Sequence, residues 1–198
     1  MIINPTLDTL LGELEAFGLA NDAAHAERGS RMLNITRDTG QLLAVLVQAR
    51  GARRLLEIGT SNGYSTLWLA HAAQGLQGTV VTVELAQDKF AMAQANFARA
   101  QLAQLIEQKL GDAGQVLREA QDGAHDFIFL DSARGQYQAW WPQLDRVLVA
   151  GGVLVVDNAT SHYEEMAPFL DGIRDDPRYT TCLVPVGKGE FIAVKSAT

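Results

Sequence analysis

Two polar residues that could act as ligands, Asp157 and Asn158, stand where a short apolar run ends. The preceding letters GGVLVV are typical of a buried strand, which polar side chains rarely continue. The pair could form a turn, cap the next helix, or present oxygen atoms to a bound group. The rest of the chain has to decide between these three roles.

Acidic residues also stand at the ends of other apolar runs. Four of the five runs end in an acid or are followed at once by one, and the first carries Glu57 just before its end. The other acids are Glu84, Asp112 and Asp131. Amphipathic stretches with helical spacing lie between the runs, which predicts a doubly wound, mostly parallel α/β sheet. Ligands of such sheets bind at the carboxyl ends of the strands, where these acids fall.

The segment LLEIGTSNGYSTLWLA is typical of a strand, a glycine turn and the start of a helix. Gly59 and Gly63 let the backbone turn tightly and approach a ligand, and the helix N-terminus offers free N–H groups to an anion. The Gly-x-x-x-Gly spacing differs from that of dinucleotide binders, and the lysine of a P-loop is absent. Glu57, just before the turn, would repel a phosphate.

S-adenosylmethionine, which has no phosphate, fits these features better. Ser65 and the helix N-terminus are placed for its carboxylate, and Glu57 for its ammonium group through water. Glu84 is placed to accept from the ribose hydroxyls, and Asp112 from the adenine amino group. Each acid alone could equally be a helix cap. We therefore predict a cofactor site that comprises Glu57, Gly59, Thr60, Ser61, Gly63, Ser65, Glu84, Leu85, Asp112 and Ala113.

The order of these elements predicts one domain over residues 1–198, with N-terminal helices and a lid in 1–50 and the cofactor-binding core in 51–198. Thr6 is the predicted cap of the first helix, and the polar letters NDAAHAERGS after this helix predict a loop or lid. Near the end of the chain, two strand-like segments are separated only by GKG, which predicts an antiparallel hairpin.

The composition limits the class of partner and the compartment. The net charge is −7 and no segment gathers Lys and Arg, which argues against nucleic acid as the partner. No apolar stretch approaches the roughly 20 residues of a membrane span, and no signal-like segment follows Met1. The single Cys182 lies in an apolar run and is expected to be buried and inert. Together these features predict a cytoplasmic protein.

Several segments together resemble the catechol and caffeoyl-CoA O-methyltransferases and their small bacterial relatives. The resemblance covers residues 33–195 and rests on LNITRDTGQLL, LLEIGTSNGYSTLWLA, VTVELAQDKFAMAQANF, LGDAG, FIFLDSARGQY and GGVLVVDNAT. It implies a Rossmann-like methyltransferase fold, with a mostly parallel seven-stranded sheet, helices on both faces and the C-terminal antiparallel hairpin. It also implies a homodimer, and it places Leu33, Asn34 and Ile35 by the methionine half of the cofactor and Tyr64 near it.

In that family the acid that ends the fourth strand and the Asp-Asn pair that ends the fifth hold a divalent cation. The matching residues here are Asp131, Asp157 and Asn158, and Asp131 also borders the cofactor. Oxygen ligands suit Mg²⁺ best, with Ca²⁺ or Mn²⁺ as alternatives. Such an ion would orient a vicinal diol and lower the pKa of the attacked hydroxyl. This would give Asp157 and Asn158 the third of their three roles.

One position departs from the family pattern. Where the family has a lysine as general base, three residues after the first metal-binding acid, this chain has Arg134, which cannot accept a proton. Arg134 could stabilise a phenolate, lie at the surface or anchor an anionic substrate group, or mark a vestigial metal site. If a base is needed, His162 is the first hypothesis and Lys188 the second. The alternative for His162 is an ordinary polar residue in the first turn of a helix.

The sequence thus predicts an S-adenosylmethionine-dependent O-methyltransferase that acts on a small hydroxylated, catechol-like acceptor with a divalent metal. The catalytic residues in this hypothesis are Asp131, Arg134 and His162. The alternatives are a metal-independent methyltransferase for another small molecule and a non-catalytic module that binds S-adenosylmethionine. An NAD-dependent oxidoreductase is disfavoured by the glycine spacing and the terminal hairpin.

Overall fold

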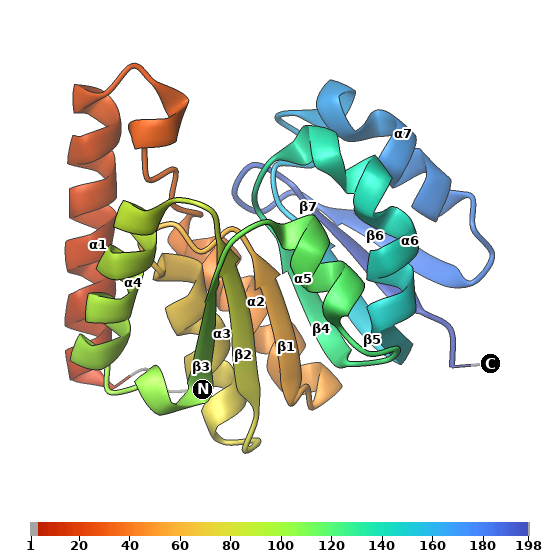
Figure 1. Cartoon of the computed structure of the whole chain (residues 1–198), viewed down its shortest axis with the longest axis horizontal. Coiled ribbons are helices and arrows are strands. Elements are labelled where there is room, and N and C mark those ends of the chain that lie inside the picture. The colour runs from red at the N-terminus through yellow and green to blue at the C-terminus, as the bar shows by residue number, and fades with distance from the viewer. Residues whose placement is uncertain (1–3, 198) are drawn as a thin grey trace.

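The computed structural model describes residues 4–197, which form a seven-stranded sheet between two layers of helices (Figure 1). The strands are β1 (Arg54–Ile58), β2 (Thr79–Glu84), β3 (Ile106–Leu110), β4 (His125–Leu130), β5 (Leu148–Val156), β6 (Tyr179–Val184) and β7 (Glu190–Lys195). The helices are α1 (Pro5–Ala24), α2 (Arg37–Arg50), α3 (Tyr64–Gln74), α4 (Gln87–Arg99), α5 (Ala113–Glu119), α6 (Tyr137–Val147) and α7 (Tyr163–Arg174). Short 3₁₀ turns are η1 (Arg28–Ser30), η2 (Ala103–Leu105) and η3 (Arg134–Gln136).

The strand order is β3-β2-β1-β4-β5-β7-β6. Strands β1 to β5 pair in parallel, whereas β7 runs antiparallel to both β5 and β6. The predicted fold class is therefore confirmed, including the C-terminal hairpin. The hairpin forms because the linker between β6 and β7 is too short for a crossover helix.

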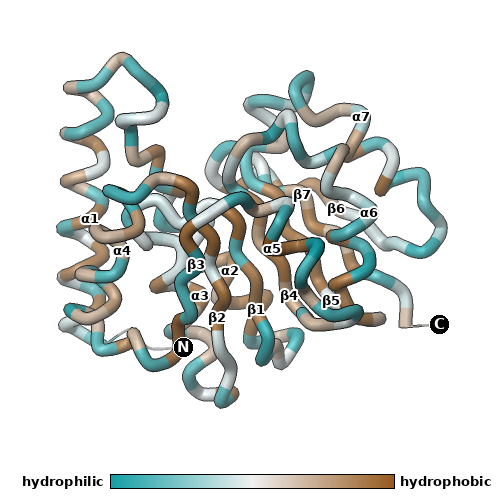
Figure 2. The backbone as a smooth tube through the Cα atoms, viewed as in Figure 1, coloured by the Kyte–Doolittle hydropathy of each residue, from teal (hydrophilic) through white to brown (hydrophobic). Residues whose placement is uncertain are grey.

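Alternate residues of each strand supply two separate cores. Leu55 and Phe127 face one side of the sheet and pack with α1 to α4. Leu56 and Ile128, each the next residue in its strand, face the other side and pack with α5 to α7. Figure 2 shows the apolar residues concentrated along the strands between these layers. Near-continuous apolar strands are expected when both faces of a parallel sheet are covered.

The change of helix layer leaves an opening in the middle of the sheet. From β1 the chain moves outward to β2 and β3, and it then returns to β4 on the other side of β1. The loop after β1 therefore leads away from the loop after β4, although β1 and β4 are neighbours in the sheet. Ligands of open α/β sheets bind at this switch point, outside the carboxyl ends of the strands.

The structure differs from the sequence predictions at the first helix. Asn4, not Thr6, caps α1, since its Oδ1 accepts from the Leu7 backbone N–H at 2.8 Å. Helix α1 then continues to Ala24, so the predicted lid is shorter and only its second half is irregular. The polar run NDAA can form the exposed end of α1 because the apolar face that α1 buries lies earlier in the helix, from Leu7 to Leu14.

Two further observations concern the surface. Cys182 is exposed on strand β6, so the prediction that it is buried was wrong. The reason is that β6 lies at the edge of the sheet, with one neighbour only. No helix within residues 4–197 combines the length and the apolar character that a bilayer crossing requires.

Candidate active site

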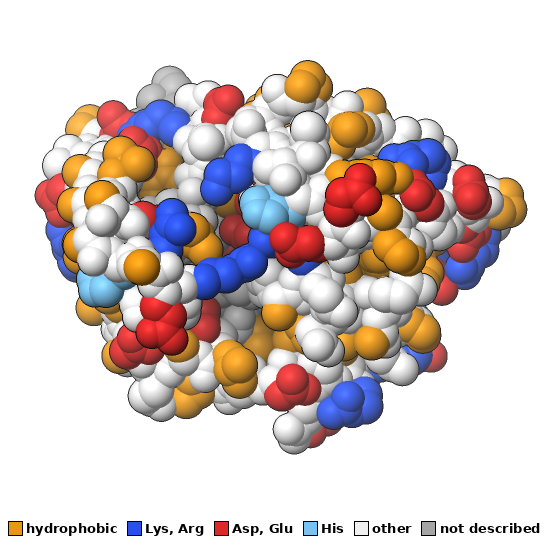
Figure 3. Space-filling view, turned by 90° about the horizontal axis from the view of Figure 1, so that it is seen from above, with side chains coloured by type: hydrophobic (Ala, Val, Ile, Leu, Met, Phe, Trp, Pro, Cys, Tyr) orange, Lys and Arg blue, Asp and Glu red, His pale blue; other side chains and the backbone are white. Residues whose placement is uncertain are grey.

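A cavity of about 850 Å³ lies at the switch point between β1 and β4. This volume is within the range of about 300–1,000 Å³ that small-molecule sites occupy. The segment of residues 28–35 covers one side of the cavity, and Trp140 and Glu165 lie on another. In the view of Figure 3, Lys and Arg side chains surround a hollow in which acidic atoms are visible.

Most of the residues predicted to bind the cofactor reach the cavity wall. They are Leu33, Ile35, Gly59, Thr60, Ser61, Tyr64, Ser65, Glu84, Leu85, Asp112, Ala113 and Asp131. Glu57 and Gly63 are not among the residues that line it. Asp112 is also a helix cap, since its carboxylate accepts from the Gln115 N–H at 2.8 Å. The cap role considered for this acid is therefore confirmed, and its contact with the adenine stays a prediction.

The glycine turn has a conformation that only glycine adopts without strain. Gly59 has φ +108°, and a Cβ at this position would lie 2.0 Å from the backbone oxygen of Asp131. The turn therefore packs against the end of β4, which brings the cofactor loop to the acid that follows β4. Gly63 has φ +87°, and it makes room for Phe97 of α4, so packing explains the glycine at this position, and its contact with the cofactor stays a prediction.

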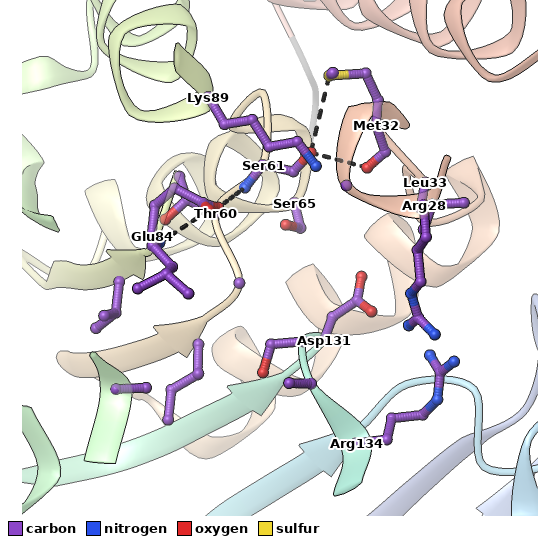
Figure 4. Close-up of a pocket in the computed structure, with 18 of the residues that line it drawn as sticks. Arg28, Met32, Leu33, Thr60, Ser61, Ser65, Glu84, Lys89, Asp131 and Arg134 are labelled. Carbon is purple, nitrogen blue, oxygen red and sulfur yellow. Dashed lines mark hydrogen bonds between the residues drawn. The ribbon is translucent and has the colours of Figure 1, made fainter. Parts of the chain in front are cut away.

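Glu84 fixes the same turn from β2 (Figure 4). Its carboxylate accepts from the Ser61 N–H at 2.8 Å and from the backbone N–H groups of Leu85 and Ala86 at 2.9 Å. These bonds hold the loops after β1 and β2 together on one wall of the cavity. The ribose-binding role predicted for Glu84 remains compatible with this position, because a carboxylate can accept about four hydrogen bonds.

Glu57 is buried beneath the glycine turn. Its carboxylate accepts from Ser65 Oγ and Thr82 Oγ1, each at 2.6 Å, and from Thr66 Oγ1. Burial raises its pKa to about 7, against the opposing effect of these three hydrogen bonds. The structure therefore does not bring Glu57 to the predicted ammonium site. A residue within the strand points to a face of the sheet, here toward α3, and not to its carboxyl edge.

Glu57→Gln is expected to remove part of the pH dependence of stability. Since the pKa of Glu57 is raised from 4.5 to about 7, the folded state binds more protons than the unfolded state between these values. Its contribution, on the order of 3 kcal/mol, is present below about pH 4.5 and is lost as the pH rises to 7. Denaturant unfolding at pH 5 and pH 8 measures it, with the exposed Glu107→Gln as control. Parallel pH curves for Glu57→Gln and the wild type would contradict this assignment.

Tyr64 lines the cavity but directs its hydroxyl away from it. The hydroxyl donates to Glu15 of α1 at 2.5 Å, and Glu15 also accepts from Arg37 Nε at 2.9 Å. This network joins α1, α2 and α3 behind the cavity. The ring and backbone of Tyr64, and not its hydroxyl, therefore lie near the predicted cofactor site.

The predicted metal ligands lie together at the ends of β4 and β5. The Asn158 amide donates to Asp157 and, at 3.3 Å, to Asp131. Asn158 has φ +66°, a conformation that asparagine tolerates better than most residues. Burial, followed by repulsion from Asp157, raises the pKa of Asp131 well above its usual value. The turn that Asn158 makes therefore sets two carboxylates beside each other.

Glu190 adds a third acid that the sequence analysis did not identify. It is fully buried, and its carboxylate accepts from Thr39 Oγ1 at 3.0 Å. Burial, followed by repulsion from the neighbouring Asp157, raises its pKa to about 10. The sequence feature that could have indicated Glu190 is its position as the first residue of the apolar strand EFIAVK, because a buried acid needs a partner.

The cluster fits a hard cation in its donor types. Among residues 4–197, no three His, Cys, Asp or Glu side chains are arranged to hold an ion. A cation bound by Asp131 and Asp157 would take the amide oxygen of Asn158 as its third side-chain ligand once this amide turns over, because its NH2 group faces both carboxylates here. Two carboxylates and an amide oxygen suit Mg²⁺ or Ca²⁺, and a cation would relieve the repulsion that raises the pKa of Asp131.

Arg134 is not a surface residue. Its side chain is only 5% exposed, and its Nε donates to Glu165 of α7 at 2.9 Å. Among the three roles left open by the sequence, a surface position is therefore wrong. Arg134 lines the cavity beside Asp131, as Figure 4 shows.

The two residues considered as general base lie differently. His162 immediately precedes α7, and its Nδ1 lies 2.8 Å from Ser161 Oγ. It is not among the residues that line the cavity. Partial burial, followed by the positive charge of Arg134, lowers its pKa. Lys188 is exposed at the tip of the β6–β7 hairpin, and its backbone oxygen accepts from Thr160 and Ser161.

Further residues of the cavity had no distinct signal in the sequence. Lys89 of α4 reaches across to the covering segment and donates to the Arg31 backbone oxygen at 2.7 Å. Met32 and Trp140 also line the cavity. Such residues become neighbours only through the crossing of loops and helices, which spacing along one element cannot reveal.

Comparison with known proteins gives the family. A family profile described as "O-methyltransferase" matches residues 17–196. A catechol O-methyltransferase of Mycobacterium tuberculosis is 37% identical over 153 residues, which cover 76% of this chain and 67% of that protein. A caffeoyl-CoA O-methyltransferase of Petunia hybrida is 28% identical over 181 residues, covering 80% and 74% of the two chains.

A solved structure agrees with these sequence relatives. The O-methyltransferase from Bacillus cereus in complex with SAH has a TM-score of 0.78 and 27% sequence identity, and the match covers 99% of this chain and 93% of that one. The similarity thus includes the segments that form the cavity and the acidic cluster. This chain belongs to the O-methyltransferase family and is a methyltransferase.

Proposed function

We propose that this methyltransferase transfers a methyl group from S-adenosylmethionine to one hydroxyl of a small catechol-like acceptor, with a divalent cation, Mg²⁺ in the first place, held by Asp131, Asp157 and Asn158. The proposal rests on the position of Asp131, where the cavity meets the acidic cluster. Asp131 lines the cavity that the glycine turn borders, and it also belongs to the acidic cluster. The reacting groups would therefore meet at Asp131.

For the cofactor, the proposal assigns the wall that the glycine turn forms. The backbone at the start of α3 and Ser65 would receive the carboxylate, Glu84 the ribose and Asp112 the adenine edge. Leu33 and Ile35 would cover the methionine half from the segment before α2. Support for the cofactor comes from the Bacillus cereus relative, which was solved in complex with SAH.

For the acceptor, the proposal assigns the end of the cavity beside Asp131. A bound cation would fix two neighbouring hydroxyls and lower the pKa of the attacked one. The chain itself orients the acceptor, excludes water and holds the attacking oxygen in line with the methyl group, which is what a displacement requires. Arg134 adds a fixed positive charge to the wall of the same cavity.

Calorimetric titration of Mg²⁺, Mn²⁺ and Ca²⁺ tests the cation site in protein saturated with S-adenosylhomocysteine. We expect saturable binding with one ion for each chain, and loss of that binding in Asp157→Ala. Asp175→Ala, an exposed acid beyond α7, is the matched control and should bind as the wild type does. Absence of binding both with and without catechol would reject the metal-assisted part of the proposal and favour a metal-independent methyltransferase.

Catechol and caffeoyl-CoA in the names of the relatives support a small hydroxylated acceptor. The homodimer and the cytoplasmic location stay predictions from the resemblance and the composition. Sedimentation of the purified chain would distinguish a dimer from a monomer.

A further inference from the structure

A pair of arginines lies at the acceptor end of the cavity. Arg134 follows β4 and Arg28 belongs to η1 in the covering segment. Both line the cavity, and Figure 4 shows their guanidinium groups pointing toward each other beside Asp131. These two residues are 106 positions apart (134 − 28), so the fold and not the local sequence brings them together.

The nitrogens of the two guanidinium groups have few hydrogen-bond acceptors within the protein. Among the described residues, Glu165 is the one acid with a salt bridge to Arg134, through Nε, and its side chain is 49% exposed. Within residues 4–197, neither the terminal nitrogens of Arg134 nor the guanidinium of Arg28 has a hydrogen-bond partner. The pKa of Glu165 is lowered first by Arg134, and the charge of Arg28 contributes as well. Glu165 is thus the carboxylate bonded to the pair, whereas Asp131 interacts with Arg134 through its charge without a direct bond.

The burial of Arg134 bears on whether its guanidinium could bind a ligand. The Arg134 side chain is 95% buried (100 − 5), yet its terminal nitrogens are aimed into the cavity. Since these N–H groups are unpaired within the protein and open onto the cavity, they are placed to donate to a ligand that supplies acceptors. Its planar fork matches a carboxylate through two parallel hydrogen bonds, which a lysine at the same position could not make.

From these observations we infer that Arg28 and Arg134 bind a carboxylate of the acceptor, so that the preferred substrates are aromatic vicinal diols that carry a carboxylate on the ring. The inference rests on the proposed function for the diol and adds the group at the other end of the ring. The proximity of Arg134 to Asp131 favours a compact acid over an anion at the end of a long carrier, because the two sites border one cavity. It also gives the arginine at this position a role other than that of a base.

The test compares an acid with its neutral ester. The affinities of 3,4-dihydroxybenzoate and methyl 3,4-dihydroxybenzoate are measured by calorimetry in protein saturated with S-adenosylhomocysteine and Mg²⁺. The wild type is expected to bind the acid about 10- to 100-fold more tightly, which corresponds to a charge-assisted pair. Arg28→Gln and Arg134→Gln should each reduce this preference at least about fivefold, and Arg28→Gln should leave the ester affinity nearly unchanged.

Two further variants separate anion binding from a structural role. Glu165→Gln removes the carboxylate that competes for Arg134, and it should increase the preference for the acid. A purely structural link between η3 and α7 predicts no such increase. Arg53→Gln is the matched control, because this exposed arginine precedes β1 at the opposite edge of the sheet. Arg28 is exposed, so its replacement keeps the test valid if Arg134→Gln does not fold.

Equal affinities of the wild type for acid and ester, or an unchanged preference in the Arg28 variant, would overturn the inference. Methyl transfer to both compounds is followed in parallel. Equal transfer to acid and ester would uphold the proposed function and reject the carboxylate site. A preference for the acid in binding, without methyl transfer to either compound, would uphold the carboxylate site and count against the proposed function.

Discussion

Asp131→Asn is expected to lower kcat/KM for methylation of catechol by at least about 100-fold, since loss of a ligand should exceed the roughly 10- to 100-fold effect of losing an outer partner. Asp131 is the residue that the cavity and the acidic cluster share. Asparagine keeps the shape of the side chain and removes its charge. Steady-state kinetics with saturating S-adenosylmethionine and Mg²⁺ measure the effect.

Stability distinguishes this effect from simple unfolding. Burial and the neighbouring Asp157 raise the pKa of Asp131, so its charge is unfavourable in the folded protein. The free energy of unfolding of Asp131→Asn at pH 8 should therefore equal or exceed that of the wild type. Asp175→Asn, which replaces an exposed acid, should leave both quantities unchanged. Catechol turnover at the wild-type rate in Asp131→Asn would reject the assigned role.

Gly59→Ala is expected to lower the free energy of unfolding by at least about 3 kcal/mol, through strain and overlap together. The new Cβ would lie 2.0 Å from the Asp131 backbone oxygen, and the backbone has φ +108°. Relief requires the glycine turn to move away from β4, which would also disturb the cofactor wall. For a chain of 198 residues this change corresponds to a fall in Tm of about 6–12 °C.

Gly75→Ala is the matched control for this variant. Gly75 follows α3 with φ −67°, and a Cβ there would meet nothing within 4 Å. Alanine at this position should be neutral or stabilising by up to about 1 kcal/mol. Calorimetric unfolding and titration with S-adenosylhomocysteine report on both variants. A Gly59→Ala protein with the Tm and cofactor affinity of the wild type would show that the turn is not constrained by β4.

The mostly parallel sheet, its terminal hairpin and the main site positions could be predicted from the sequence because they follow from short apolar runs, helical spacing and one short linker. Short apolar runs that end in acids placed Glu84, Asp131 and Asp157 at one edge of the sheet. The same reasoning failed for Glu57, whose position inside β1 directs it to the face beneath α3. Being near the end of a strand is therefore insufficient; the acid must be the last residue of the strand, as Glu84 is, or follow it, as Asp131 and Asp157 do.

Contacts between distant segments account for what the sequence could not predict. Glu190 meets Thr39 from 151 residues away, and Arg28 reaches the cavity only because η1 folds over it. Gly63 seemed equivalent to Gly59 in the sequence, but it adapts to Phe97 of a later helix. The role of Arg134 also depended on its burial, which no local pattern gave.

The most direct test of the account is methyl transfer from S-adenosylmethionine to catechol and to phenol, with Mg²⁺ and then with excess EDTA. Mass spectrometry of the products and the appearance of S-adenosylhomocysteine report the reaction. We predict monomethylated catechol, a fall of at least about 100-fold on chelation that added Mg²⁺ restores, and no comparable reaction of phenol. Equal rates for the two acceptors, or a rate unaffected by chelation, would contradict a metal-assisted transfer to a vicinal diol.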